Sequence, residues 1–177
     1  MTGVQTCALP ISALASGARS WVYKSTGLHI HLNRAWFTPL ATGKLLVFIN
    51  SEDPVIRRNI IRLAGRKSCD MAKIKAKKLA PGYSNRDRYE AVNFQHEGTI
   101  ELRLFKGTLN SNHILADIEF AHALAHYVRE VSITDLENWP RFLDWTQKQG
   151  SLYREFLEFF NRAEAPTATN GMAAKEG

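Results

Sequence analysis

The sequence predicts an α+β fold, in which an antiparallel sheet has helices packed on one face and a helical segment follows at the C-terminus. Three observations support this: two short segments alternate apolar with polar residues, proline-initiated helical patterns lie between them, and the last third is rich in helical apolar stripes. The 177 residues, 45% hydrophobic and 23% charged, indicate one globular domain. The longest apolar run, Leu45–Ile49, is far shorter than the roughly 20 residues that span a bilayer, so no membrane partner is expected.

The two ends of the chain are expected to lie outside this domain. Met1–Ser12 (MTGVQTCALPIS) resembles the translation of a common sequencing adapter, and we set it aside. Cys69 is then the single cysteine, which excludes an internal disulfide and fits a reducing, cytoplasmic compartment. We therefore expect an artefact over 1–12, a partial domain over 13–162 and a disordered tail over 163–177, with the natural protein beginning further upstream.

The first strand is expected within Trp21–Asn33. Its apolar residues and its polar residues alternate, which places them on opposite faces: Leu28, Ile30 and Leu32 on one, His29, His31 and Asn33 on the other. Imidazoles are therefore expected in a row on the polar face.

A β-hairpin is expected further along, formed by Arg88–Phe94 and Thr99–Phe105 with the glycine-containing turn Gln95–Gly98. In its second strand one face is aliphatic, and the other carries Glu101 and Arg103. The aliphatic face is predicted to hold Ile100, Leu102 and Leu104.

Five helices are predicted. Thr38-Pro39 and Asp53-Pro54 are N-cap and first-position signals, and Gly65 ends the second of these helices. A third helix follows from the apolar stripe between Ile114 and Val128, a fourth starts at Asn138-Trp139-Pro140, and a fifth runs from a Ser151 cap through Phe160.

The ionisable faces of the two strands suggest a metal site. His29, His31 and Glu101 supply imidazole and carboxylate donors, which suit a divalent cation such as Mg²⁺ or Mn²⁺. Arg103, two residues beyond Glu101, would meet an anionic phosphate oxygen. The alternative is that H-x-H is only a strand pattern, and that Glu101 and Arg103 form a surface pair.

Three segments together resemble the amidoligase family: Gly27–Leu32 (GLHIHL), Arg88–Asn93 (RYEAVN) and Thr99–Phe105 (TIELRLF) followed by Gly107–Leu109. These are carboxylate–amine ligases, many of them phage-encoded, with a fold similar to glutamine synthetase and glutamate–cysteine ligase. The resemblance spans roughly residues 21–160. It implies ATP-dependent amide formation through an acyl phosphate, with small-molecule or peptide carboxylates and amines as substrates.

The resemblance also implies roles for individual residues. His29, His31 and Glu101 would hold Mg²⁺ or Mn²⁺. Arg103 and Arg88 would contact phosphate as catalytic groups, and Asn93 would orient ATP or substrate. The family's N-terminal acidic strand, with its further metal-ligating glutamates, has no counterpart here, so the fragment is expected to be inactive.

Two other functions remain open at this stage. His29-Ile30-His31 also fits a nuclease that cuts single-stranded DNA with two metal-binding histidines and a nucleophilic tyrosine, for which Tyr127 or Tyr89 would be the candidates. Eleven basic residues between Arg57 and Arg88 face only two aspartates, which suits a phosphate-bearing partner. A non-catalytic, basic nucleic-acid-binding or phage module is therefore the third hypothesis. The oligomeric state is not predicted.

The other candidates for chemistry are weak. His122 and His126, four residues apart on a helix, form a possible metal pair, but we interpret them as solvated positions at the edge of the apolar stripe. Cys69 lacks a histidine partner, His113 has no role, and His96 is expected to be exposed in the hairpin turn.

Overall fold

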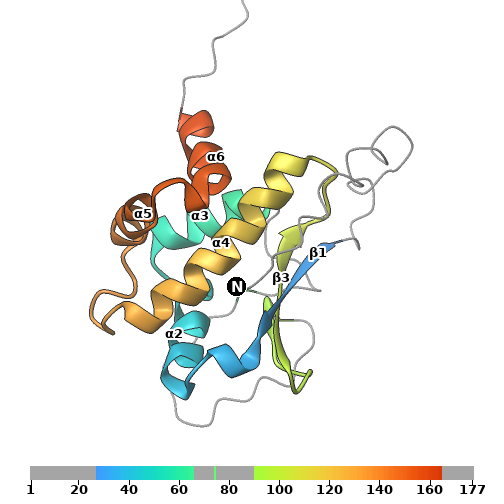
Figure 1. The fold of residues 1–177 in the computed structure, drawn as a ribbon, viewed down its shortest axis with the longest axis vertical. Coiled ribbons are helices and arrows are strands. Elements are labelled where there is room, and N and C mark those ends of the chain that lie inside the picture. The colour runs from blue at the N-terminus through green and yellow to red at the C-terminus, as the bar shows by residue number, and fades with distance from the viewer. Residues whose placement is uncertain (1–26, 66–73, 75–89, 165–177) are drawn as a thin grey trace, which may run out of the picture.

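The computed structural model describes residues 27–65, 74 and 90–164. In this part of the chain a three-stranded sheet lies against a layer of helices, which confirms the predicted α+β fold (Figure 1). Several predicted features lie outside the described residues: the adapter-like segment 1–12, Cys69, Arg88, Tyr89, the basic residues after Gly65 and the tail from 165 onward.

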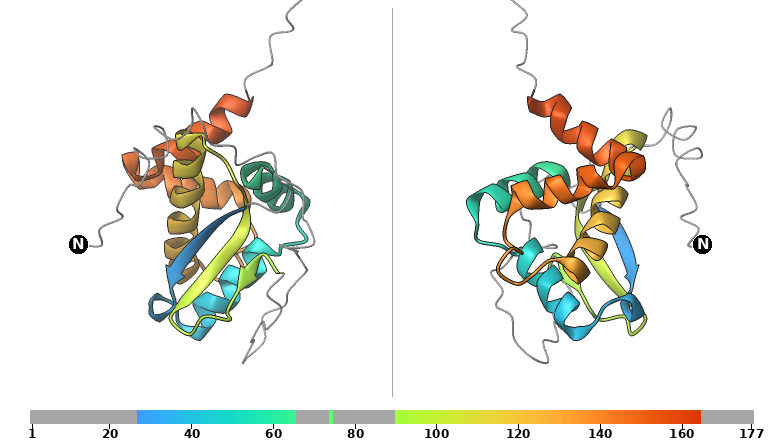
Figure 2. Two further views of the ribbon diagram at one scale, coloured as in Figure 1. Left: turned by 90° about the vertical axis from the view of Figure 1, so that its right-hand side faces the viewer. Right: turned by 60° about the vertical axis from the view of Figure 1, so that its left-hand side comes forward.

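The sheet has the strand order β1-β3-β2, and both of its outer strands pair antiparallel with β3. β1 is Gly27–Asn33, β2 is Val92–Asn93 and β3 is Thr99–Lys106. The alternation predicted in β1 is confirmed, because exposed and half-buried residues alternate along the whole strand. In the left view of Figure 2 the described helices lie behind the sheet. His29 and His31 of β1 are exposed, and we call the face of the sheet that carries them the open face.

A β-bulge interrupts the pairing of β1 with β3. Leu28 lies opposite Phe105 and Ile30 opposite Leu102, so β3 has one residue more than β1 between these pairs. The predicted aliphatic set is confirmed, because Ile100, Leu102 and Leu104 are all buried in the core. Beyond the bulge the core also takes in Phe105, across from Leu28, which packs edge-on against Phe120 of the helical layer, with 6.3 Å between ring centroids.

The predicted hairpin is present, but its turn is one residue longer than expected. A four-residue turn over 95–98 would pair Phe94 with Thr99, whereas the observed register pairs Asn93 with Glu101 and Val92 with Leu102. Paired residues of antiparallel strands share a face, so this register turns Asn93 toward the open face and Val92 toward the core. Of the described part of the predicted strand, residues 90–94, β2 takes up only Val92–Asn93.

The first two helices begin and end where the sequence predicts. α2 is Pro39–Ile49, and the Thr38 hydroxyl accepts a hydrogen bond from the Ala41 N–H. α3 is Pro54–Ala64, and the Asp53 carboxylate accepts two N–H groups of its first turn. Gly65, at φ 66°, ends α3 in the left-handed conformation that favours glycine.

The C-terminal helices are α4 (Ser111–Glu130), α5 (Trp139–Lys148) and α6 (Arg154–Glu164). The prediction of a Ser151 cap is wrong, because Gly150–Tyr153 forms a 3₁₀ turn, η2, without a side-chain cap. A carboxylate oxygen of Glu119 in α4 instead accepts the Phe156 N–H at the start of α6, over 2.8 Å. A second 3₁₀ turn, η1 (Arg34–Trp36), was not predicted.

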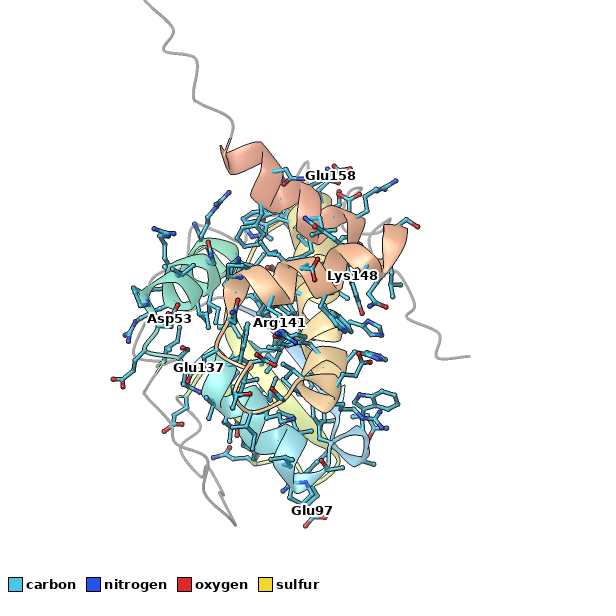
Figure 3. The ribbon with its side chains drawn as sticks, turned by 90° about the vertical axis from the view of Figure 1, so that its left-hand side faces the viewer. Asp53, Glu97, Glu137, Arg141, Lys148 and Glu158 are labelled. Atoms are coloured by element: carbon cyan, nitrogen blue, oxygen red, sulfur yellow. The ribbon has the colours of Figure 1, made fainter. Side chains whose placement is uncertain are left out.

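The core between the helices is aromatic. Phe142 of α5 is fully buried, and five aromatic rings surround it with centroids 5.1–5.9 Å away. The outer side of this layer is charged, with ion pairs from Arg141 to Asp135 and from Lys148 to Asp144 (Figure 3). In the part of the chain that the structure describes, none of the helices combines the length and apolar character needed to cross a membrane.

Candidate active site

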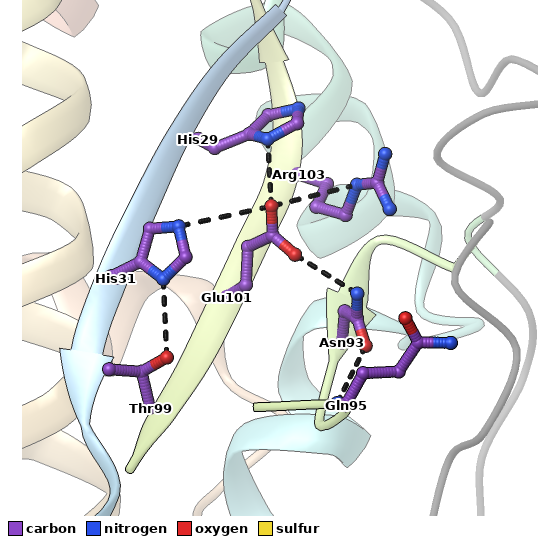
Figure 4. Close-up of polar contacts among 7 residues, drawn as sticks. All are labelled: His29, His31, Asn93, Gln95, Thr99, Glu101 and Arg103. Carbon is purple, nitrogen blue, oxygen red and sulfur yellow. Dashed lines mark hydrogen bonds and ion pairs between the residues drawn. The ribbon is translucent and has the colours of Figure 1, made fainter. Parts of the chain in front are cut away.

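The open face of the sheet brings four predicted side chains around the carboxylate of Glu101 (Figure 4). Its Oε1 atom lies 2.7 Å from Nδ1 of His29, 3.9 Å from Nε2 of His31 and 3.9 Å from Nε of Arg103. Its Oε2 atom accepts a hydrogen bond from the side-chain amide of Asn93 over 3.0 Å. Residues from three strands therefore converge on one acidic group.

Strand geometry explains this convergence. His31 is paired directly with Glu101 across β1 and β3, while His29 lies on the same face beside the bulge. Arg103 follows Glu101 by two residues and therefore projects to the same side. Asn93 is the cross-strand partner of Glu101 on the other flank, in β2.

The side chains of the cluster differ in solvent exposure. The Glu101 side chain is only 8% exposed and that of Arg103 15%, whereas His29 and His31 are 39% and 45% exposed. A buried carboxylate is costly unless cations or hydrogen-bond donors surround it, and here both do. The two imidazoles form the side of the cluster that a ligand from solvent can reach.

Two further residues lie beside the cluster, and the sequence indicated neither of them as a site residue. The hydroxyl of Thr99 is 3.2 Å from Nδ1 of His31, which leaves Nε2 of that ring turned toward Glu101. The exposed His96 ring lies 5.9 Å from the His31 ring. Thr99 precedes Glu101 by two residues, so strand alternation could have identified it.

The donor set fits a divalent cation, although it is not preformed as a metal site. Across residues 27–65, 74 and 90–164, no three His, Cys, Asp or Glu side chains make a ready metal-binding group. At the centre, His29 contacts Glu101 directly. A carboxylate oxygen with two imidazoles on the same face is nevertheless a set that Mn²⁺ accepts, and Mg²⁺ uses the carboxylate. An ion would have to replace the contact between His29 and Glu101.

The nuclease hypothesis does not find its nucleophile among the described residues. Tyr127 in α4 is 2% exposed, and its hydroxyl donates to the Asp135 carbonyl. Its ring packs in the helical layer, behind the sheet face that carries His29 and His31. Tyr89 lies outside the described residues, so it is not placed.

His113, His122 and His126 make more contacts within the protein than predicted, whereas His96 is exposed as expected. His122 and His126 are half-buried, as expected at the edge of the apolar stripe, but they are not merely solvated, because their ring centroids lie 4.5 Å apart. His122 is within hydrogen-bond distance of the Tyr153 hydroxyl, and burial, followed by the neighbouring His126, lowers its pKa. His113 also has a structural role, because its Nε2–H donates to the Leu63 carbonyl.

Comparison with known proteins gives one family. Residues 39–125 match the model of a family described as "putative amidoligase enzyme". The match covers Asn93, Glu101 and Arg103 but begins after His29 and His31, so those two assignments depend on the structure and on the sequence motif. Neither the curated proteins nor the solved structures gave a match.

Proposed function

We propose that the protein is an ATP-dependent ligase that joins a carboxylate to an amine, as the match of residues 39–125 to the amidoligase family model suggests. The observation that supports this most directly is the convergence of His29, His31 and Arg103 on Glu101. In the proposed reaction the substrate carboxylate is activated as an acyl phosphate, so the site would have to bind phosphate. A divalent cation commonly serves this purpose, because it neutralises the phosphate oxygens.

Glu101, His29 and His31 are the residues that would hold the cation. Two imidazole nitrogens make Mn²⁺ a better match than Mg²⁺, which prefers oxygen. When bound, the ion neutralises the phosphate oxygens of the nucleotide. Both imidazoles are substantially exposed, so phosphate can approach them from solvent.

Arg103 would bind the transferred phosphoryl group. Its Nε lies 3.9 Å from Glu101 Oε1, which places the guanidinium at the edge of the cluster. The planar guanidinium can pair with two oxygens of one phosphate, which orients the group and stabilises its charge during transfer. Arg88 has the same proposed role on the basis of the family resemblance alone, because it lies outside the described residues.

Trapping with hydroxylamine tests this function. An acyl phosphate reacts with hydroxylamine to give a hydroxamate, which is detected by the colour of its iron(III) complex, so an unknown amine is not needed. We expect the full-length gene product to release ADP and form hydroxamate with at least one member of a panel of amino acids and dicarboxylic acids, in the presence of Mn²⁺ or Mg²⁺. Mn²⁺ binding is measured on the present chain by electron paramagnetic resonance.

The matched variants are Glu101→Gln and Glu97→Gln, which each remove one carboxylate charge. Glu97 is exposed in the hairpin turn, so its variant is the control. We expect Glu101→Gln to abolish hydroxamate formation and to leave only the weak residual Mn²⁺ affinity of the two imidazoles, and Glu97→Gln to leave both unchanged. Full activity and Mn²⁺ affinity in Glu101→Gln would overturn the assignment.

A further inference from the structure

Both polar atoms of the Asn93 side chain are engaged in hydrogen bonds within the protein. Its Oδ1 atom accepts the backbone N–H of Gln95 over 2.9 Å, and its Nδ2 atom donates to Glu101 Oε2 over 3.0 Å. Asn93 is 3% exposed. This arrangement does not suit a residue that reaches out to a nucleotide.

The orientation of the amide is fixed by its partners. A backbone N–H can only donate, so the Asn93 atom that faces Gln95 must be the carbonyl oxygen. The NH₂ group therefore faces Glu101 and donates to its Oε2 atom. Gln95 sets the direction of the Asn93 amide, and this amide in turn sets the position of the carboxylate.

The hydrogen bond from Asn93 determines which carboxylate oxygen of Glu101 faces the other residues of the cluster. Oε2 is held by Asn93, and Oε1 is the atom that faces His29, His31 and Arg103. We propose that Asn93 is a positioning residue, which holds Oε2 so that Glu101 offers Oε1 as a single ligand atom to the cation. This inference rests on the proposed function, and it replaces the role that the family resemblance implied for Asn93, namely orienting ATP or substrate.

A double-mutant cycle on Mn²⁺ affinity tests the proposal, with the metal alone as the probe and no nucleotide present. The loss of a residue that orients a metal ligand typically weakens metal binding about 10- to 100-fold. We expect Asn93→Leu, which keeps the volume but cannot donate, to weaken Mn²⁺ binding by this factor. In the Glu101→Gln background the same change should have no further effect, because Asn93 acts through Glu101.

A direct role for Asn93 in nucleotide binding predicts the opposite result in this double-mutant cycle. If Asn93 contacts the nucleotide, Asn93→Leu weakens binding of metal-free ATP and leaves Mn²⁺ affinity unchanged, and its effect adds to that of Glu101→Gln. Either result overturns the proposal. Glu97→Gln again serves as the matched control, with no expected change in any arm.

Crystal structures of the metal-free wild type and of Asn93→Leu separate this inference from the proposed function. We expect Glu101 to adopt one rotamer against His29 in the wild type and to lose that contact in the variant. A Glu101 side chain that stays in place in Asn93→Leu overturns the positioning role whatever the metal data show. A wild type that binds no Mn²⁺, together with a displaced Glu101 in the variant, contradicts the ligase proposal and leaves the positioning role intact.

Discussion

Asp117 in α4 lies one turn after His113, with its Oδ1 atom 3.7 Å from His113 Nε2, yet the two side chains share no hydrogen bond. The imidazole proton is donated instead to the Leu63 carbonyl over 2.8 Å. Asp117 is 1% exposed, and none of the described residues gives its Oδ1 atom a hydrogen bond. Burial therefore raises the pKa of this carboxyl to about 9, because desolvation outweighs any attraction at 3.7 Å.

Replacing Asp117 with asparagine is expected to stabilise the protein at neutral pH. The folded state binds a proton at Asp117 up to about pH 9, whereas the unfolded chain releases it near pH 4, so the free energy of unfolding falls as pH rises between these values. The slope is at most about 1.4 kcal/mol per pH unit. Asp117→Asn, a neutral isostere, should remove this slope and stabilise the fold by about 1–3 kcal/mol at pH 7.

Urea unfolding at pH 5, 7 and 8.5 measures both quantities. Asp144→Asn is the control, because Asp144 is 58% exposed and pairs only at the surface with Lys148. The control should keep the wild-type slope. An unchanged slope in Asp117→Asn would show that Asp117 ionises normally in the folded protein.

The helix starts could be read from the sequence because their signals are local. Thr38 and Asp53 accept N–H groups two or three residues ahead, and the proline that follows each needs no hydrogen bond at that position. The start of α6 could not be read in this way, because Glu119 supplies its cap from 37 residues earlier in the chain.

The site was predictable to the extent that it depends on strand alternation. Within each strand the period of two placed His29 with His31, and Glu101 with Arg103. That the two strands pair with His31 opposite Glu101 depends on a register set by packing over 70 residues of sequence separation. The role of Asn93 depends on a single residue of turn length, for which the sequence offers no clear signal.

Phe142 is expected to be the most sensitive core position among the described residues. It lies at the centre of five aromatic rings contributed by α2, α4, α5 and α6. Phe142→Ala removes the ring and leaves a cavity that these helices cannot easily close, so it should destabilise the fold by about 3–5 kcal/mol. Chemical denaturation measures this cost, and Phe142→Leu should lose clearly less. Equal losses in the two variants would contradict the packing argument.

Tyr127 separates the ligase from the single-strand nuclease. A nuclease of this kind would leave a covalent tyrosine–DNA adduct, and Tyr127→Phe would abolish it. The Tyr127 hydroxyl is instead occupied by the Asp135 carbonyl, and the ring is enclosed by Phe48, Phe142 and Trp145. We therefore expect the wild type to form no adduct through Tyr127 when incubated with single-stranded DNA and Mn²⁺. Tyr127→Phe should cost only about 1 kcal/mol of stability, the value of one hydrogen bond.

Denaturing electrophoresis of radiolabelled DNA after incubation detects such an adduct directly. Tyr153→Phe is a matched control, because Tyr153 is equally buried and its hydroxyl likewise has a partner, His122. Both variants should behave like the wild type in this assay. An adduct that forms in the wild type and in Tyr153→Phe but disappears in Tyr127→Phe would require α4 to open. It would favour the nuclease over the ligase, since Tyr127 has no other route to DNA held on the open face of the sheet.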